Sequence, residues 1–214
     1  MIGLEQVHSA VSVVVALESM RNVSQVRGFR WQDFWKHSIA CGIIARAIAD
    51  QVRLKDRSVT PAAFTTGILH DVGKLFLLAH FAPQFSDVLA YMAEHSCSML
   101  EAEQETLGTN HAFIGQYLAE RWALPAEICV AIGKHHKPLS SCASDADRLA
   151  NIVHVADAVA QMLNLGSGGN RVASQIRPGA IEALKIEDGL AGLQADSIRR
   201  QVQEFLSVLP LQSS

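Results

Sequence analysis

Five histidines and two aspartates of metal-ligand type are spread along the 214-residue sequence. Imidazole nitrogens and carboxylate oxygens are donors that divalent transition metals bind in proteins, so convergence of these side chains would create a metal site. The candidate ligands are His37, His70, Asp71, His111, His135, His136 and Asp157.

Helical spacing places these side chains on the same faces as apolar residues. His37 is followed at such spacing by Cys41 and Ile44, and Asp157 shares a stripe with Val153 and Ala160. An unpaired carboxylate on so apolar a face would be costly to bury, and a nearby cation would remove that cost.

Each residue taken alone has a plainer interpretation. A single inward histidine is more often a hydrogen-bonded core residue than a ligand, and Asp157 could be neutralised by an arginine or a backbone donor. Five separate helices, however, would each have to turn an imidazole or a carboxylate inward by accident. The set as a whole therefore favours a metal site.

The elements that must position these residues are predicted to be helices throughout. Glycine and proline divide the chain into helix-length segments, and no segment has the two-residue period of a half-buried strand. The fold class is therefore all-α. Helices are expected at Leu4–Met20, Trp31–Leu54, Pro61–His80, Pro83–His95, Ser98–Leu107, Asn110–Ala123, Ala126–His136 and Asp145–Leu165, with two more after Pro178.

Length and composition indicate one principal domain. Half of the residues are hydrophobic, 18% are charged, and the formal net charge is only −3 with scattered Lys and Arg, which argues against a nucleic-acid polymer as partner. The expected domain spans residues 1–165. Residues 166–214 then form a glycine-rich loop and C-terminal helices that pack on or near it.

The cysteines and the most lipid-like run predict a cytoplasmic protein. The four cysteines are far apart, so reduced core thiols are expected. The run Ala10–Leu17 is much shorter than the roughly 18 to 20 residues that span a bilayer, so no membrane partner is expected.

The first expected helix has a wide apolar face at the very start of the chain. Such a face needs a cover from this chain, from a second copy, or from a preceding segment. Self-association through this helix, or contact with a signalling protein, is thus one expected partnership.

The sequence around the candidate ligands resembles the HD superfamily of metal-dependent phosphohydrolases, and within it the HDOD type found in bacterial signalling proteins. The resemblance rests on Phe-Trp-Lys-His-Ser around His37, Gly-Ile-Leu-His-Asp-Val-Gly-Lys around His70, Gly-Thr-Asn-His-Ala-Phe-Ile-Gly around His111, and the later Trp-Ala-Leu-Pro, His-His-Lys-Pro and Ile-Val-His-Val-Ala-Asp segments. It runs in order over Met1 to Leu165.

The sequence departs from these relatives in two places. Relatives usually have additional helices before the segment that resembles Gly3–Met20, so the front of the domain is expected to be missing or shortened here. The Gly-Tyr-Pro sequence of the related HD-GYP type, which cleaves cyclic di-guanylate, does not follow His136. Activity on that dinucleotide is therefore not implied.

The resemblance implies a helical bundle with one or two divalent ions between its helices, and Fe, Mn, Zn and Ni all suit the donors. If two ions bind, the resemblance implies that Asp71 bridges them. The first ion would then also be bound by His37, His70 and Asp157, and the second by His111, His135 and His136.

The resemblance also suggests further site residues and a substrate class. Lys74 would steady a phosphoryl group or extend to solvent, while Asp33 would bind an extra metal, orient His37 or lie at the surface, and His154 is expected at the surface. The substrate would be a phosphorylated small molecule or nucleotide. A non-catalytic interaction module with a structural or sensing metal is the alternative.

Overall fold

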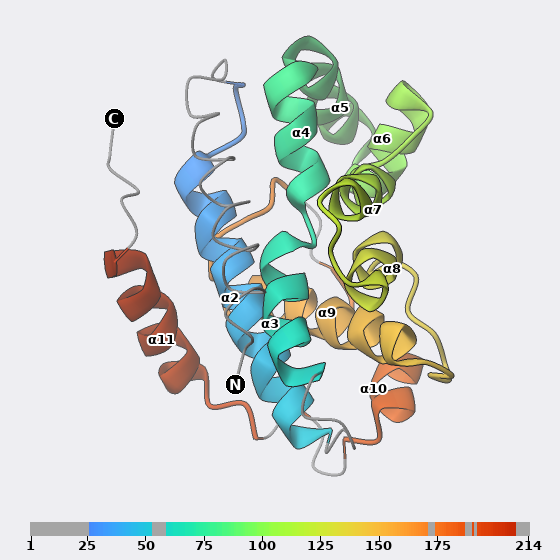
Figure 1. The fold of residues 1–214 in the computed structure, drawn as a ribbon. Coiled ribbons are helices and arrows are strands. Elements are labelled where there is room, and N and C mark those ends of the chain that lie inside the picture. Colours follow the sequence, from blue (N-terminus) through green and yellow to red (C-terminus); the bar gives the residue numbers. More distant parts are fainter. Residues whose placement is uncertain (1–25, 53–58, 171–173, 187–189, 191, 209–214) are drawn as a thin grey trace.

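Every regular element in the part of the chain that the structure describes is an α-helix (Figure 1). The computed structural model describes residues 26–52, 59–170, 174–186, 190 and 192–208. The expected helix Leu4–Met20, with its apolar face, lies outside these residues. The helices are α2 (Trp31–Gln51), α3 (Val59–Leu69), α4 (Val72–His80), α5 (Ala82–His95), α6 (Met99–Leu107), α7 (His111–Arg121), α8 (Ala126–Lys134), α9 (Asp145–Met162), α10 (Pro178–Leu184) and α11 (Ala195–Val208).

The helices enclose two apolar clusters. The larger one is built mainly from α2, α3, α8 and α9, with α10 and α11 packed on its outside. The smaller one lies among α4, α5 and α6, at the opposite end of the molecule from α10 in Figure 1. The junction between α3 and α4 therefore joins the two halves of the core.

Helices α2 and α9 are buried over most of their length because their apolar residues surround nearly the whole helix. In α2, Ile44 and Ile48 are fully buried, and in α9 the same is true of Val153 and Ala160. A helix with apolar residues on all sides belongs at the centre of a core. The candidate ligands on these two helices are consequently held in a closely packed interior.

The expected single helix over Pro61–His80 is wrong, because the structure divides it at His70 and Asp71. The backbone N–H of Lys74 donates to the carbonyl of Asp71 at 2.9 Å, which starts the new helix α4. Helix α4 packs against α7 so closely that a Cβ on Gly73 would overlap the carbonyl oxygen of His111. The break places two adjacent ligand-type side chains at the meeting point of two helices.

Other helix ends differ from the sequence expectation by only a few residues. The helix expected from Asn110 begins at His111, because the Asn110 side chain is the N-cap and accepts from the Phe113 N–H at 3.0 Å. The helix expected to reach His136 ends at Lys134. Capping boxes at Ser98 and Ser144 determine where α6 and α9 begin.

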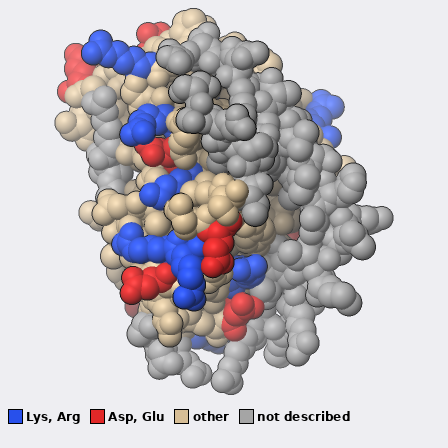
Figure 2. Space-filling view, turned by 90° about the vertical axis from the view of Figure 1, so that its left-hand side faces the viewer, with Lys and Arg blue, Asp and Glu red and all other residues tan. Residues whose placement is uncertain are grey.

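One segment is apolar enough to resemble a membrane helix, and one face of the molecule shows how surface charges are distributed. By length and composition alone, Ala62–His80 could cross a membrane, but 83% of the apolar window is buried inside the protein, as in the core helix of a globular fold. Figure 2 shows one face of the molecule, on which basic side chains lie beside acidic ones.

Candidate metal centre

Four parts of the fold bring most of the candidate ligands together in the interior. His37 comes from α2, His70 and Asp71 from the α3–α4 junction, His111 from the first turn of α7, and His135 from the end of α8. Two groups of ligand atoms each lie within 4.8 Å of one another. They are Asp71, His111, His135 and His136, and His37, His70 and Asp71.

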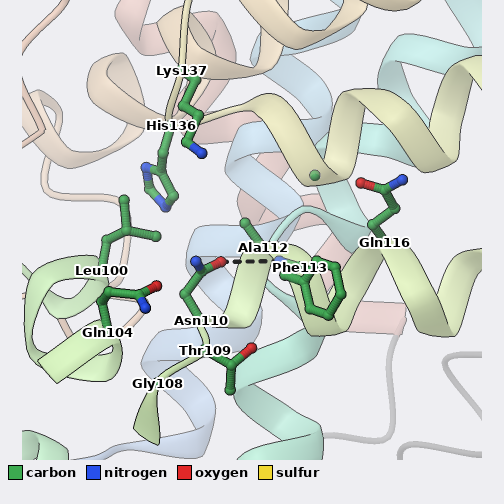
Figure 3. A pocket seen from close by; sticks show the side chains of 11 residues that line it. Leu100, Gln104, Gly108, Thr109, Asn110, Ala112, Phe113, Gln116, His136 and Lys137 are labelled. Carbon is green, nitrogen blue, oxygen red and sulfur yellow. Dashed lines mark hydrogen bonds between the residues drawn. The ribbon is translucent and has the colours of Figure 1, made fainter. Parts of the chain in front are cut away.

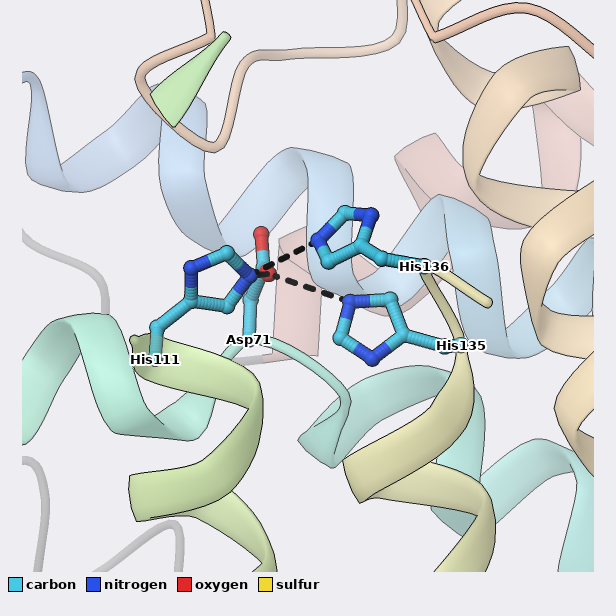
Figure 4. Close-up of side chains that lie close together, drawn as sticks. All are labelled: Asp71, His111, His135 and His136. Carbon is cyan, nitrogen blue, oxygen red and sulfur yellow. Dashed lines mark hydrogen bonds and ion pairs between the residues drawn. The ribbon is translucent and has the colours of Figure 1, made fainter. Parts of the chain in front are cut away.

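Asp71 belongs to both groups and presents a different oxygen to each. Its Oδ1 lies 3.2 Å from Nε2 of His111 and 3.8 Å from Nε2 of His135. Its Oδ2 lies 2.6 Å from Nζ of Lys74 and 3.4 Å from Nε2 of His70. Figure 4 shows the imidazoles of His111, His135 and His136 directed toward this carboxylate.

Backbone carbonyls determine the tautomers of two of the histidines. Nδ1 of His70 lies 2.8 Å from the carbonyl of Gly67, and Nδ1 of His135 lies 2.6 Å from that of Ile132. A carbonyl oxygen only accepts, so each Nδ1 carries a proton, and each Nε2 presents a lone pair when the ring is neutral. These two Nε2 atoms are buried and lack a hydrogen-bond partner, as does Oδ1 of Asp71. A cation would satisfy all three, so the residues fit a metal ion.

His111 is oriented by Glu103, a residue that the sequence analysis missed. The fully buried Glu103 accepts through Oε2 from the backbone N–H of His111 at 2.9 Å and from Nδ1–H at 2.6 Å. Nε2 of His111 then points to Nε2 of His136, 2.8 Å away. The signal in the sequence is the position of Glu103 one turn after Met99, on the buried face of α6.

Asp157 contacts the cluster through His37. Its Oδ1 lies 3.0 Å from Nε2 of His37 and accepts from Gln161 at 2.7 Å, while Oδ2 accepts from Ser174 at 3.0 Å. The ring nitrogens of His37 are buried and have no aligned hydrogen bond in spite of this short distance. Asp157 therefore lies beside the group of His37, His70 and Asp71 without belonging to it.

Burial and neighbouring charges favour the ligating form of Asp71, His135 and His136. In spite of burial, the charge of Asp71 raises the pKa of His70 well above its ordinary value, and the charge of Glu103 raises the pKa of His111. Burial, with the positive charge of neighbouring histidines, lowers the pKa of His135 well below its ordinary value and that of His136 to about 3. Burial alone would raise the pKa of Asp71, but His70 and Lys74 outweigh it and hold that pKa well below the usual range. Neutral imidazoles beside an ionised carboxylate are the species that bind a divalent metal.

The glycine-rich loop closes over one side of the cluster. A Cβ on Gly168 would lie 2.5 Å from Oδ2 of Asp71 and 3.1 Å from Nζ of Lys74, so only glycine allows this approach. The loop is attached to α2 where the Ser167 N–H donates to the carbonyl of Asp33 at 2.9 Å. This segment, predicted only as a glycine-rich loop, covers one side of the site.

The structure shows the positions of three further residues that the sequence analysis considered near the site. Lys74 is fully buried on Asp71 and does not extend to solvent. The Asp33 side chain is half-buried, pairs with Arg30 at 3.3 Å, and lies outside both ligand groups. The surface position expected for His154 is wrong, because its buried Nδ1 lies 3.1 Å from the carbonyl of His135.

A pocket of about 410 Å³ opens beside His136, the one partly exposed member of the two groups (Figure 3). Its walls include the amides of Gln104 and Asn110, the exposed ring of Phe113, and Lys137. None of the residues that the structure places around it is acidic. It is therefore a route by which a small polar molecule can approach the cluster.

A comparison with protein families identifies the chain. Residues 1–138 match the model of the HDOD domain. The chain belongs to the HDOD family. No curated protein matches it.

Solved structures show that the HDOD chain has the all-α, HD-type fold that its sequence resembles. An HDOD domain protein of unknown function from Geobacter sulfurreducens is 22% identical, with a TM-score of 0.75 over 98% of this chain and 72% of that one. A protein from Marinobacter aquaeolei VT8, provisionally described as a signal transduction protein, is 19% identical, with a TM-score of 0.75 over 97% of this chain. This chain spans only 45% of that protein.

A third solved structure has a more distant fold. It is a protein from Shewanella amazonensis SB2B, provisionally described as a phosphohydrolase, with 23% identity and a TM-score of 0.58 over 91% of this chain and 72% of that one. At these identities all three comparisons establish the shared fold. The buried His/Asp cluster is observed in this chain itself and does not rest on these comparisons.

Proposed function

We propose that this HDOD chain is a bacterial signal-transduction module that holds a divalent metal in its buried His/Asp cluster. The observation that carries the proposal is the set of unpartnered buried ligand atoms, Nε2 of His70, Nε2 of His135 and Oδ1 of Asp71. Leaving such atoms buried and unpaired is costly, and a bound ion offsets that cost. The mixed imidazole and carboxylate donors suit Fe, Mn, Zn or Ni.

A structural or sensing role agrees best with the burial of the cluster. The ligand side chains from α2, α7, α8 and the α3–α4 junction are almost fully enclosed, and an ion among them would tie these elements together. Sites closed on all sides by protein ligands are typical of structural metals. The provisional description of the Marinobacter relative supports the signalling class, and the four free cysteines support a cytoplasmic location.

Phosphoester hydrolysis is the second candidate, and the pocket beside His136 favours it. A bound metal would supply Lewis acidity to a phosphoryl oxygen. In this chain, Lys137 and the amides of Gln104 and Asn110 would bind and orient an anionic ligand in the pocket. Glu103 would hold the proton on Nδ1 of His111, which keeps Nε2 free.

Elemental analysis of the full chain, purified without added metal and again after loading with Mn²⁺, tests the metal. We expect at least one ion per chain, lost in His70→Ala and retained in His80→Ala, whose histidine is exposed on α4. A chain that takes up no ion under either condition contradicts the proposal.

Turnover of a phosphoester panel separates the two candidates. Hydrolysis by the loaded chain, absent in His70→Ala, would establish the enzyme. Metal binding without turnover of nucleotides and generic phosphoesters would establish the structural or sensing role.

A further inference from the structure

Helix α7 exposes two large aromatic side chains, on the side of the molecule away from α11 (Figure 1). Phe113 is 64% exposed, and Tyr117, one turn later, is 49% exposed. Arg121 follows after another turn and is also exposed. Helical spacing aligns these three side chains along one line of the helix surface, which we call the α7 stripe. Aromatic and arginine side chains are enriched at the centres of protein interfaces, so the α7 stripe is a candidate interaction surface.

The cation at the end of the α7 stripe is already ordered within the chain. Nε and Nη2 of Arg121 donate to the hydroxyl of Tyr117 at 3.0 and 2.8 Å, and the guanidinium carbon lies 5.1 Å from the centroid of the Tyr117 ring. Within the ranges that the structure describes, no carboxylate forms a salt bridge with Arg121. The guanidinium would therefore lose little conformational entropy on meeting a partner.

The α7 stripe is complementary to a second copy of itself. A two-fold axis through Tyr117 would set two α7 helices antiparallel, with the residue one turn before Tyr117 opposite the residue one turn after it. The ring of Phe113 would then face Arg121 of the partner subunit, and the two Tyr117 rings would meet at the axis. A guanidinium over an aromatic ring is a favourable pair, and the two-fold axis forms this pair twice.

The charges on the exposed face of α7 also fit a second copy. Glu120 and Arg121 are adjacent, exposed and opposite in sign. The face thus has no net charge of its own that would select a strongly acidic or strongly basic partner. Two identical faces of this kind can approach without net repulsion.

We propose that the chain forms a two-fold dimer through α7, in which Phe113 of each copy packs against Arg121 of the partner subunit. The dimer goes beyond the proposed metal function and does not depend on it. Phe113 is also a wall of the pocket beside His136. Each copy would therefore bring a guanidinium group to the pocket of the other.

Sedimentation equilibrium of the full chain over a wide range of concentrations tests the proposal. We expect a dimer whose dissociation constant rises about 30-fold in Phe113→Arg, because guanidinium groups then face each other across the interface. Combining Phe113→Arg with Arg121→Phe restores the pair with its members exchanged and should recover most of the lost affinity. Met162→Arg, at a 67% exposed position on α9, should leave the dimer unchanged.

Cross-linking tests the position of the axis. Tyr117→Cys should form a disulfide between two copies under mild oxidation, because a residue on the axis meets its own equivalent. The parent chain and Ser86→Cys, exposed on α5, should not.

Four results would overturn the proposal. They are a chain that stays monomeric at every concentration, a dimer that Phe113→Arg leaves intact, a double variant as weak as Phe113→Arg alone, and a Tyr117→Cys chain that does not cross-link. Circular dichroism checks that each variant is folded. If Phe113→Arg does not fold, cross-linking of Tyr117→Cys decides alone.

Discussion

At the scale of single residues, the cluster is controlled by groups that orient its members as well as by the ligand-type side chains. Glu103 and the carbonyls of Gly67 and Ile132 determine which ring nitrogen of three histidines is protonated. Without these acceptors, each imidazole could present either nitrogen. The three Nε2 atoms are therefore directed inward before any ion arrives.

Glu103→Gln should weaken metal binding without unfolding the chain. The amide keeps the size of the side chain, but its neutral oxygen is a weaker acceptor than the carboxylate oxygen that accepts from Nδ1 and the backbone N–H of His111. We expect the dissociation constant for Mn²⁺ to rise about 10- to 100-fold in competition titrations with a chelator. Glu105→Gln, exposed on the same helix, is the matched control; an equal effect in both variants would contradict the role of Glu103.

Acid should destabilise the metal-free protein in part through His136. The folded state lowers the pKa of His136 from 6.5 to about 3 by burial and by the charge of His111, so folding favours the neutral ring. The contribution of His136 to the free energy of unfolding is fully present above pH 6.5 and is lost as the pH falls from 6.5 toward 3. His70 and His111, whose pKa values are raised, contribute with the opposite sign.

His136→Gln isolates this contribution, because glutamine takes up no proton in that range. Urea unfolding at pH 7 and pH 5 should show that the variant loses about 1–2 kcal/mol less than the parent chain. The exposed His95→Gln should behave like the parent. An unchanged acid dependence in His136→Gln would rule out this contribution.

At the scale of elements, helical periodicity was sufficient to predict which faces turn inward. His37, His111 and Asp157 lie on buried faces because the apolar residues around them repeat at helical spacing. The break at His70 and Asp71 could not be predicted in this way, since it arises from the close packing of Gly73 against α7. The burial of Glu103 also depends on a contact with another helix.

The role of the glycine-rich loop was equally inaccessible to sequence patterns. Composition alone indicated a glycine-rich loop, whereas the path of the chain places Gly168 against the Asp71–Lys74 pair. The position of a loop over a site depends on tertiary contacts such as the Ser167 hydrogen bond to Asp33. Such contacts leave no periodic signal.

Gly168→Ala should destabilise the chain through overlap alone. The added methyl group would lie 2.5 Å from Oδ2 of Asp71, so the loop or the carboxylate must move. We expect a loss of about 1–3 kcal/mol in chemical unfolding, together with weaker Mn²⁺ binding. Gly179→Ala, where the new atom would meet Ser140 only at 3.4 Å, should be neutral or stabilising; similar losses in the two variants would exclude a specific cover.

At the scale of the whole molecule, the region after the family match is part of the same packed structure. The HDOD model ends at residue 138, yet α9 supplies a large share of the main core and α11 packs against α2. Ile198 and Val202 of α11 are buried, and the ring of Phe205 lies 6.0 Å from that of Phe64. We propose that residues 166–214 belong to the same cooperative unit as the domain before them.

Deleting residues 195–214 should therefore lower the stability of the remaining chain. Burial of Ile198 and Val202 contributes about 1.5–3 kcal/mol each, and their removal also uncovers apolar atoms of α2. Thermal unfolding should show a clearly lower midpoint. Deleting only residues 209–214 is the control; a midpoint equal to that of the full chain after the longer deletion would show that α11 is dispensable.

The enclosure of the cluster affects how fast an ion could be exchanged. His37, His70, Asp71, His111 and His135 are each no more than 1% exposed, and Gly168 covers Asp71. Because His136 borders the pocket, an ion held there would exchange through that side of the cluster, while exchange through the other sides would require the loop or a helix to move away, an event with the slow rate of local unfolding.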